Sequence, residues 1–479
     1  MKQLMQPASP PAPGRVLLIV ASAVFLASLD LFIVNIAFPD IEDAFSGSSV
    51  SGLSWVLNGY AIVFAALLVP AGRLADRFGR RRAFLLGLGV FVGASAACGL
   101  AWSVPSLVGF RVLQAAGAAL LMPSSLALLL DAFPAERRAK AIGAWAGVGG
   151  VAAALGPPLG GVLVTLSWRW VFLVNLPVGV AAIVAGRRVL RESRDESDLR
   201  LPDALGAALL IAGVSALSWA LVDAPDVGWG STRTVLLLAA GAALLVGVVL
   251  RSRSLDRAHA PILDLELFGA RAFSLASLSA FLFSVAFAAM LLGNVLFLTG
   301  PWDESVLVAG LSLAPGPMLA AVVAVTSGRL SARIGQGPTA VLGNLVFGVG
   351  VLWFLWRAEL RPDYVGAILP GMVLTGIGVG LLLPSVSTAV ASTLRPSRLA
   401  SGSAVLTASR QLGSVLGVAG LVAVYGAHAG PDPLDAFRAG WIFMALACVV
   451  GAVAAAGIGA AHPRAAPAQD GAAPAVAQS

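Results

Sequence analysis

The sequence contains 479 residues, of which 58% are hydrophobic and only 11% are charged. Because a soluble domain carries about 25% charged residues, this composition excludes a soluble protein and indicates a chain that crosses a membrane many times. The formal net charge of +7 is spread over many short polar breaks, so it does not indicate a nucleic-acid-binding patch.

The first apolar run covers 16–38 and is long enough to cross a bilayer as a helix. Asp30 lies well inside this run, where a carboxylate costs about 2.5–3.5 kcal/mol on insertion scales. We expect a proton or cation site that faces a water-filled space. The alternative is an acid near a helix end that reaches the interface. We expect the helix to be retained rather than cleaved as a signal peptide.

Apolar runs separated by short polar breaks predict fourteen transmembrane helices. Their expected spans are 16–38, 53–71, 83–103, 105–130, 139–165, 170–189, 203–223, 234–250, 272–299, 305–327, 337–356, 364–391, 402–427 and 438–461. With the N-terminus inside, 24 Lys and Arg residues fall on the cytoplasmic side and 5 on the outer side. This bias predicts a multi-pass protein of the plasma membrane with both termini in the cytoplasm.

The chain divides into six expected segments. A Pro-rich tail over 1–14 and an Ala/Pro-rich tail over 462–479 are expected to be disordered. Two six-helix bundles are expected over 15–190 and 272–461, with a linker and two extra helices over 191–250 between them. The segment 251–271 mixes charge with an apolar run and is expected to form a cytoplasmic amphipathic linker, with an interfacial helix as one form of it.

An internal repeat relates the two bundles. Residues Gly72–Gly79 and Gly328–Gly335 match at five of eight positions at an offset of 256, and the Leu121–Ser124 and Leu382–Ser385 segments match at an offset of 261. Tandem halves of this kind favour alternating access around a site near the bilayer midplane.

The loop after the second expected helix reads GRLADRFGRRR over Gly72–Arg82. Glycines permit tight turns, and an acid beside a helix end suits a neighbouring helix N-terminus. The loop resembles the signature of the major facilitator superfamily, which implies a cytoplasmic latch; the alternative is a plain positive-inside loop. The latch residues are expected to be Gly72, Asp76, Arg77, Gly79, Arg80 and Asp131, with Arg80 paired to Asp131 and Asp76 meeting Ser401–Ser403. The second copy has Ala332 in place of Asp76, so a second latch should be weak or absent.

The first helix also resembles that of the fourteen-span drug:proton antiporters in Leu29-Asp30, Asn35, Ala37 and Pro39, with Phe38 where Leu is usual. The fourth helix resembles the superfamily motif in Arg111, Gln114 and Gly117, with Ala115 in place of a Gly. A buried Arg needs an anion or backbone carbonyls, so we expect proton coupling through an Asp30–Arg111 pair. The alternative is a structural tie from Arg111 to carbonyls.

The fifth helix contains Gly156, Pro157, Gly160 and Gly161. Small residues allow close helix approach, and ordinary packing is the alternative interpretation. Resemblance to the helix-5 element of the superfamily implies an antiporter rather than a symporter. Arg410 and Gln411 in the thirteenth helix resemble the fourteen-span subfamily, and Arg410 is either a packing tie or a cavity-lining group.

The resemblance implies an all-α fold of the major facilitator type with a substrate cavity between the bundles. Its expected polar and aromatic lining is Phe32, Asn35, Asn58, Tyr60, Gln114, Asn294, Arg410 and Gln411. A mostly apolar cavity with few fixed polar groups suits small amphipathic organic molecules.

We therefore expect a proton-coupled antiporter that exports hydrophobic or cationic small molecules, acts as a monomer and uses no cofactor beyond the proton gradient. One alternative is a dedicated exporter of one endogenous metabolite, lipid or siderophore. A remote alternative is an intramembrane lipid-modifying enzyme, which would need a catalytic cluster at one interface. The three histidines, His259, His428 and His462, have no metal-ligand spacing, and Cys98 and Cys448 lie far apart in apolar runs.

Overall fold

The computed structural model describes residues 13–45, 50–194, 201–255, 259–394, 399–428 and 432–459. Fourteen helices in this part of the chain are long and apolar enough to cross a membrane, which confirms the predicted number. Because the fourteen spans alternate in direction, Pro13 and Gly459 lie at the same face of the molecule. We call this the terminal face and the other the distal face. The two expected tails fall almost wholly outside the described residues.

The N-terminal bundle is formed by six spans, two of which carry a short additional helix. Its elements are α1 (Pro13–Ile36), α2 (Phe38–Ala44), α3 (Val50–Phe78), α4 (Arg80–Gly99), α5 (Val104–Ala132), α6 (Ala135–Val164), α7 (Trp170–Leu173) and α8 (Asn175–Val189). Within the bundle α1 packs against α5, α6 and α8, and α5 packs against α3 and α4.

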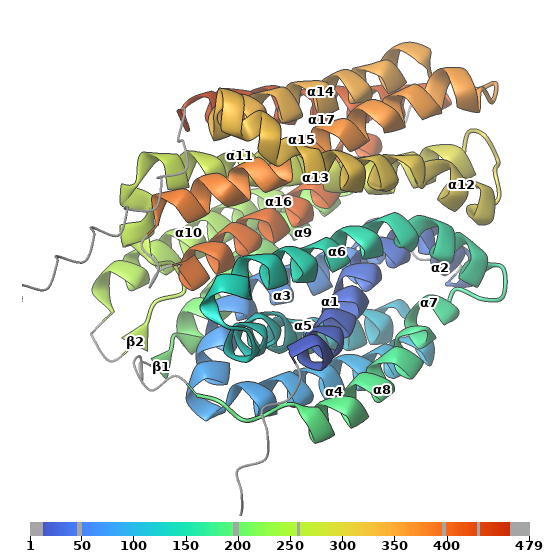
Figure 1. Cartoon of the computed structure of the whole chain (residues 1–479). Coiled ribbons are helices and arrows are strands. Elements are labelled where there is room, and N and C mark those ends of the chain that lie inside the picture. Colours follow the sequence, from blue (N-terminus) through green and yellow to red (C-terminus); the bar gives the residue numbers. More distant parts are fainter. Residues whose placement is uncertain are drawn as a thin grey trace, which may run out of the picture.

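The C-terminal bundle is built in the same way. Its elements are α11 (Arg271–Thr299), α12 (Val306–Leu313), α13 (Pro315–Ile334), α14 (Gln336–Arg357), the π-helical turn η2 (Tyr364–Ile368), α15 (Leu369–Thr393), α16 (Leu399–Ala427) and α17 (Pro433–Ala456). Figure 1 shows this bundle, coloured yellow to red, above the blue and green N-terminal bundle.

Two expected single spans are interrupted. The run 170–189 divides into α7 and α8 at Val174, and the run 305–327 belongs to α12 and α13, which meet at Ala314. The second break has a clear cause, because Pro315 and Pro317 have no amide hydrogen to donate to the preceding turn. The chain still crosses in one pass, since both parts continue in the same overall direction.

The extra helices α9 (Ala204–Val227) and α10 (Thr232–Ser254) lie between the bundles in sequence. In space, α9 packs against α3 of one bundle and α16 of the other, whereas α10 packs mainly against α9. The first extra helix therefore touches both halves, and α10 is peripheral.

The segment 251–271 differs from an interfacial amphipathic helix. Helix α10 continues to Ser254, and the remainder contains the two-residue strand β2 (His259–Ala260) and a five-residue 3-10 helix, η1 (Leu265–Gly269). Strand β2 pairs in parallel with β1 (Leu201–Pro202). Residues that precede a proline favour extended backbone, and Leu201 and Ala260 both precede one. The prolines that follow these two residues therefore explain why the segment forms strands in place of a helix.

The two halves repeat the same close helix contact. In the N-terminal bundle Gly87 of α4 and Gly117 of α5 face each other, and a methyl group on Gly87 would lie 2.8 Å from the Gly117 carbonyl oxygen. In the C-terminal bundle Gly343 and Gly378 do the same, and a methyl group on Gly343 would lie 3.0 Å from the Gly378 oxygen. These pairs are related by the offsets of 256 and 261 residues that the sequence repeat predicts.

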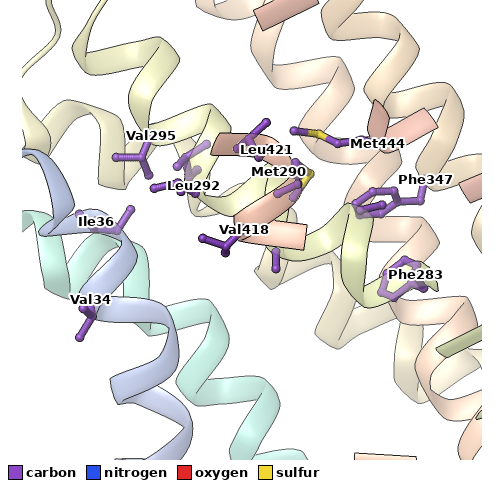
Figure 2. Packing of buried hydrophobic residues seen from close by; sticks show 14 of the residues in the cluster. Val34, Ile36, Phe283, Met290, Leu292, Val295, Phe347, Val418, Leu421 and Met444 are labelled. Carbon is purple, nitrogen blue, oxygen red and sulfur yellow. The ribbon is translucent and has the colours of Figure 1, made fainter. Parts of the chain in front are cut away.

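The bundles share one apolar core. Residues of α1 such as Val34 and Ile36 belong to the same buried cluster as Phe283 and Met290 of α11. Figure 2 shows the α1 residues on one side and those of α11, α14, α16 and α17 on the other. The halves meet through α1 with α11, α3 with α16, and α6 with α12 and α13.

Candidate functional site

Asp30 lies at the centre of a polar network inside the N-terminal bundle. The guanidinium Nη1 of Arg111 donates to Asp30 Oδ2, and Gln114 Nε2 donates to Asp30 Oδ1 over 2.8 Å. Asn175 Nδ2 of α8 is 3.4 Å from the same oxygen. The Asp30 and Arg111 side chains are 0% and 1% exposed, so the pair is wholly removed from solvent and lipid. The predicted Asp30–Arg111 pair is therefore present.

A second set of side chains holds the first in place. Ser95 of α4 accepts from Asn175 over 3.0 Å and from Gln114 over 3.2 Å. The Ser95 hydroxyl in turn donates to the carbonyl of Phe172 over 2.8 Å. The network thus joins α1, α4, α5, α7 and α8. Neither Ser95 nor Asn175 was among the predicted site residues, and nothing in the sequence distinguishes Ser95 from other helical serines.

Arg111 is bound by more than the carboxylate. Its Nε donates to the Val56 carbonyl of α3 over 3.1 Å, and its Nη1 donates to Gln114 Oε1 over 2.8 Å. Its guanidinium carbon lies 4.1 Å from the centre of the Tyr60 ring, a favourable cation–π position. Both interpretations of Arg111 therefore hold together, because the same side chain pairs with an acid and with a backbone carbonyl.

The residues predicted to line one cavity fall into separate places. Tyr60 and Gln114 belong to the Asp30 network. Phe32 lies on the other side of α1, where its ring is 6.3 Å from that of Phe287 in α11. Asn35 donates to the Leu31 carbonyl of its own helix over 2.8 Å, and Asn294 lies 3.7 Å from the Met372 sulfur in the C-terminal bundle.

Asn58, Arg410 and Gln411 belong to α3 and α16, which pack against each other across the two halves. Both amide atoms of Asn58, Nε of Arg410 and Nε2 of Gln411 are buried, and none has a hydrogen-bond partner within the described protein. The three side chains therefore place buried atoms without partners on the two helices that form this junction between the bundles.

The predicted helix-5 element lies where three helices cross. A methyl group on Gly160 would lie 3.0 Å from Ile33 Cγ1 of α1, and one on Gly156 would lie 2.6 Å from Phe32 Cβ. On the other side of α6, Gly310 of α12 packs directly on the Pro157 carbonyl, and Gly161 packs on the backbone of Leu307. The four residues therefore let α6 approach α1 of its own bundle and α12 of the opposite bundle.

The predicted latch is formed at the terminal face. Arg80 donates from Nε to Asp76 over 2.9 Å and pairs through Nη1 with Asp131 at 2.8 Å, as expected. The Ser193 hydroxyl donates to Asp131 over 2.6 Å, and Glu192 accepts from the Arg81 amide over 3.0 Å, so the segment after α8 also belongs to the latch. Sequence analysis missed Glu192 and Ser193.

Other latch residues have simpler surroundings. Gly79 has φ +118°, a backbone conformation that favours glycine, Gly72 packs on Pro123 of α5, and Arg77 lies 5.7 Å from the Phe78 ring. The expected contact from Asp76 to Ser401–Ser403 falls partly outside the described set, at the Ser401 side chain. Among the described residues, Asp76 pairs with Arg80 and forms no hydrogen bond with Gly402 or Ser403. In the second copy, Arg329 and Arg333 are exposed and form no ion pair within the described residues.

An acidic cluster lies on α2, at the distal face. Partial burial, and then the charge of Asp43, raise the pKa values of Asp40 and Glu42 above their usual range. Among the described residues, no group of three or more His, Cys, Asp or Glu side chains is placed to hold a metal ion.

Comparison with known families gives one match over most of the chain. The model of the Major Facilitator Superfamily matches residues 20–325 and 302–478. The Tetracenomycin C resistance and export protein of Streptomyces glaucescens is 35% identical over 431 residues, which are 90% of this chain and 78% of that protein. A Methylenomycin A resistance protein of Streptomyces coelicolor is 32% identical over 439 residues, which are 91% of this chain and 90% of that protein.

Solved structures share the fold. The POT family transporter PepTSo superimposes with a TM-score of 0.67 at 18% identity, over 93% of this chain and 98% of that one. A D-xylose-proton symporter superimposes with a TM-score of 0.66 at 15% identity, over 92% of this chain and 97% of that one. At these identities the likeness concerns architecture alone.

Proposed function

Because the chain belongs to the Major Facilitator Superfamily, we propose that it is a proton-coupled antiporter that exports small amphipathic organic molecules by alternating access. The protein is a transporter and not an enzyme. Relatives at 32–35% identity carry names of drug or antibiotic resistance and of export, such as the Multidrug resistance protein Stp of Mycobacterium tuberculosis. These names support export as the direction of transport.

The observation that carries the proposal is the ionisable pair of Asp30 and Arg111 in a dry bundle interior. Arg111 stabilises the ionised carboxylate, and burial favours the neutral carboxyl group. Arg111 also has the Val56 carbonyl and Gln114 as partners. A small movement of α1 against α5 that weakens the pair would leave the carboxylate unpaired, and an unpaired buried carboxylate takes up a proton.

The coupling of proton binding to transport then depends on whether the Asp30–Arg111 pair is formed. In this proposal, forming the pair and binding a proton at Asp30 exclude each other. Phe32, two residues further along α1, contacts the C-terminal half through Phe287, so movement between the halves reaches the Asp30 helix directly. Each proton that enters the cell releases about 2.3 kcal/mol per 100 mV of membrane potential.

We further propose that the protein lies in the plasma membrane with both termini in the cytoplasm, and that it acts as a monomer. The excess of Lys and Arg at the terminal face supports this orientation. The latch of Arg80, Asp76 and Asp131 lies at this same face.

The test uses the Asp30→Asn variant in an efflux-deficient bacterium and in inside-out membrane vesicles. A panel of unrelated growth inhibitors first identifies exported compounds, and protection against one compound only would favour a dedicated exporter. For an exported compound, Asp30→Asn should abolish uptake driven by a proton gradient, while Asp223→Asn, which alters a peripheral pair with Arg233, should not. Unchanged proton-driven uptake in Asp30→Asn protein of normal yield and monodispersity would remove Asp30 from the mechanism.

A further inference from the structure

Arg410 and Gln411 are adjacent on α16, and each carries a buried donor atom that has no acceptor among the described residues. Arg410 Nε and Gln411 Nε2 are buried and have no hydrogen-bond partner within the described residues. No carboxylate within those residues forms an ion pair with Arg410. Arg410 as a whole is half-buried. A cation among spanning helices without a partner is costly, so its presence calls for a reason other than packing.

The packing of α16 shows where these donors point. Gly413 and Gly417 press against the backbone of α11, at Phe281 and Val285. On a different side of the helix, Leu412 and Val415 pack with residues of α3 and α9. Arg410 lies between these two contacts, on a face whose other members recur at helical spacing and are Ser403, Thr407 and Ser414. This polar stripe follows the junction between the two bundles.

The charges of the spanning helices favour an anion beside this stripe. Asp30 is the only acid deep in a described span, and Arg111 neutralises it inside the N-terminal bundle. No described residue forms an ion pair with Arg410, so the charge that the described residues place along this stripe is positive. A cationic guest would meet repulsion there, whereas an acidic guest would supply the missing acceptor.

We propose that Arg410 and Gln411 bind an acidic group, a carboxylate or a similar oxyanion, on the exported molecule. The proposal rests on the proposed export function and narrows its substrates from hydrophobic or cationic molecules to amphipathic acids. The Arg410 guanidinium supplies charge-assisted hydrogen bonds, and the Gln411 amide supplies a further neutral donor. Asn58, whose amide has both atoms without partners on the facing helix α3, is placed to complete the polar surroundings.

The test is a growth-protection assay in an efflux-deficient bacterium that expresses the full chain. The probes are hydrophobic growth inhibitors in three size-matched groups: carboxylic acids, their neutral amides, and amines. Protection should be concentrated among the acids. Arg410→Gln should reduce protection against the acids by about tenfold, the effect of losing one charge-assisted hydrogen bond, and Arg410→Lys should restore part of it. Intracellular accumulation measured by mass spectrometry checks that protection reflects export.

Two controls keep the outcomes separate. Arg233→Gln, which changes a peripheral Arg at the start of α10, should leave protection intact. If Arg410→Gln protein is poorly folded by size-exclusion chromatography, Gln411→Leu replaces it and should weaken acid export alone. Protection confined to amines or amides, or acid export that survives both substitutions, would overturn the proposal. A set in which no compound of any group is exported would instead contradict the export function itself.

Discussion

The Cα atom of Leu307 packs on Gly161 so closely that a methyl group at position 161 would lie 3.0 Å from it. This contact joins α6 of one bundle to α12 of the other. We expect Gly161→Ala to force the two bundles apart locally, at a cost of about 1–3 kcal/mol, typical of overpacking. The measurement is the thermal unfolding temperature of the purified protein in lipid nanodiscs, together with transport of an exported compound.

The matched control for this substitution is Gly150→Ala on the same helix. No atom lies within 4 Å of the position that its methyl group would take. Alanine is a better helix former than glycine by about 1 kcal/mol, so Gly150→Ala should be neutral or slightly stabilising. Equal unfolding temperatures for the two variants would show that the α6–α12 contact is not a tight constraint.

The buried pair of Asp30 and Arg111 predicts strong coupling between two substitutions. Arg111→Met leaves the Asp30 carboxylate with only Gln114 and Asn175 as partners, and breaking such a pair costs about 3–5 kcal/mol. Replacing both residues, as Asp30→Asn with Arg111→Met, removes the need to bury an unpaired carboxylate or to protonate it, and should recover much of the loss. Thermal unfolding of the single and double variants at neutral pH gives the coupling; additive losses would contradict it.

The latch glycine predicts a local backbone effect. Gly79 has φ +118°, and a methyl group there would lie 2.5 Å from Glu192 Oε1. Gly79→Ala should therefore displace Glu192 and cost about 1–3 kcal/mol in backbone strain alone. Gly89→Ala in the following helix has open space and ordinary backbone geometry, so it is the comparison variant. Limited proteolysis at the terminal face would detect the displaced segment, and identical cleavage patterns would count against the latch.

The charged residues whose partners follow from charge alone could be predicted from the sequence. A buried Asp and a buried Arg need each other, and Arg80 beside two acids at helix ends has few other partners. The fourteen spans follow from hydropathy and the positive-inside bias, and the repeat follows from matching motifs. The predictions of the spans and of the charged pairs rest on the free-energy cost of placing a charged group in a membrane, and this cost applies at any position in the fold.

Orientation around a helix axis was harder to predict. Tyr60 and Gln114 were expected to line the cavity beside Phe32, but they turn into the bundle toward Arg111. Helix α5 shows no strong polar face, so its sequence gives no indication of which neighbour Gln114 meets. Ser95 could not be found because nothing in the sequence distinguishes it from other helical serines. Glu192 could not be found because it lies in a segment with several charges, and the sequence does not show which of them meets Arg81.

The acidic cluster on α2 predicts a pH dependence of stability. Burial first, and then the Asp43 charge, raise the pKa values of Asp40 and Glu42 in the folded protein. The folded state therefore binds protons more readily than the unfolded state, whose values are near 3.8 and 4.5. Stability contributed by these groups rises as pH falls through the folded pKa values and levels off below the unfolded ones.

Asp43→Asn removes the charge that contributes to both shifts, so it should raise the unfolding temperature at pH 7 and reduce the gain seen on acidification. Because Asp40 and Glu42 are only half-buried, the difference should be small but measurable in a pH series of thermal unfolding curves. Asp303→Asn, which changes another distal acid far from α2 in sequence, is the control and should leave the pH profile unchanged. A profile for Asp43→Asn parallel to that of the unsubstituted protein would show that repulsion within the cluster does not affect folding.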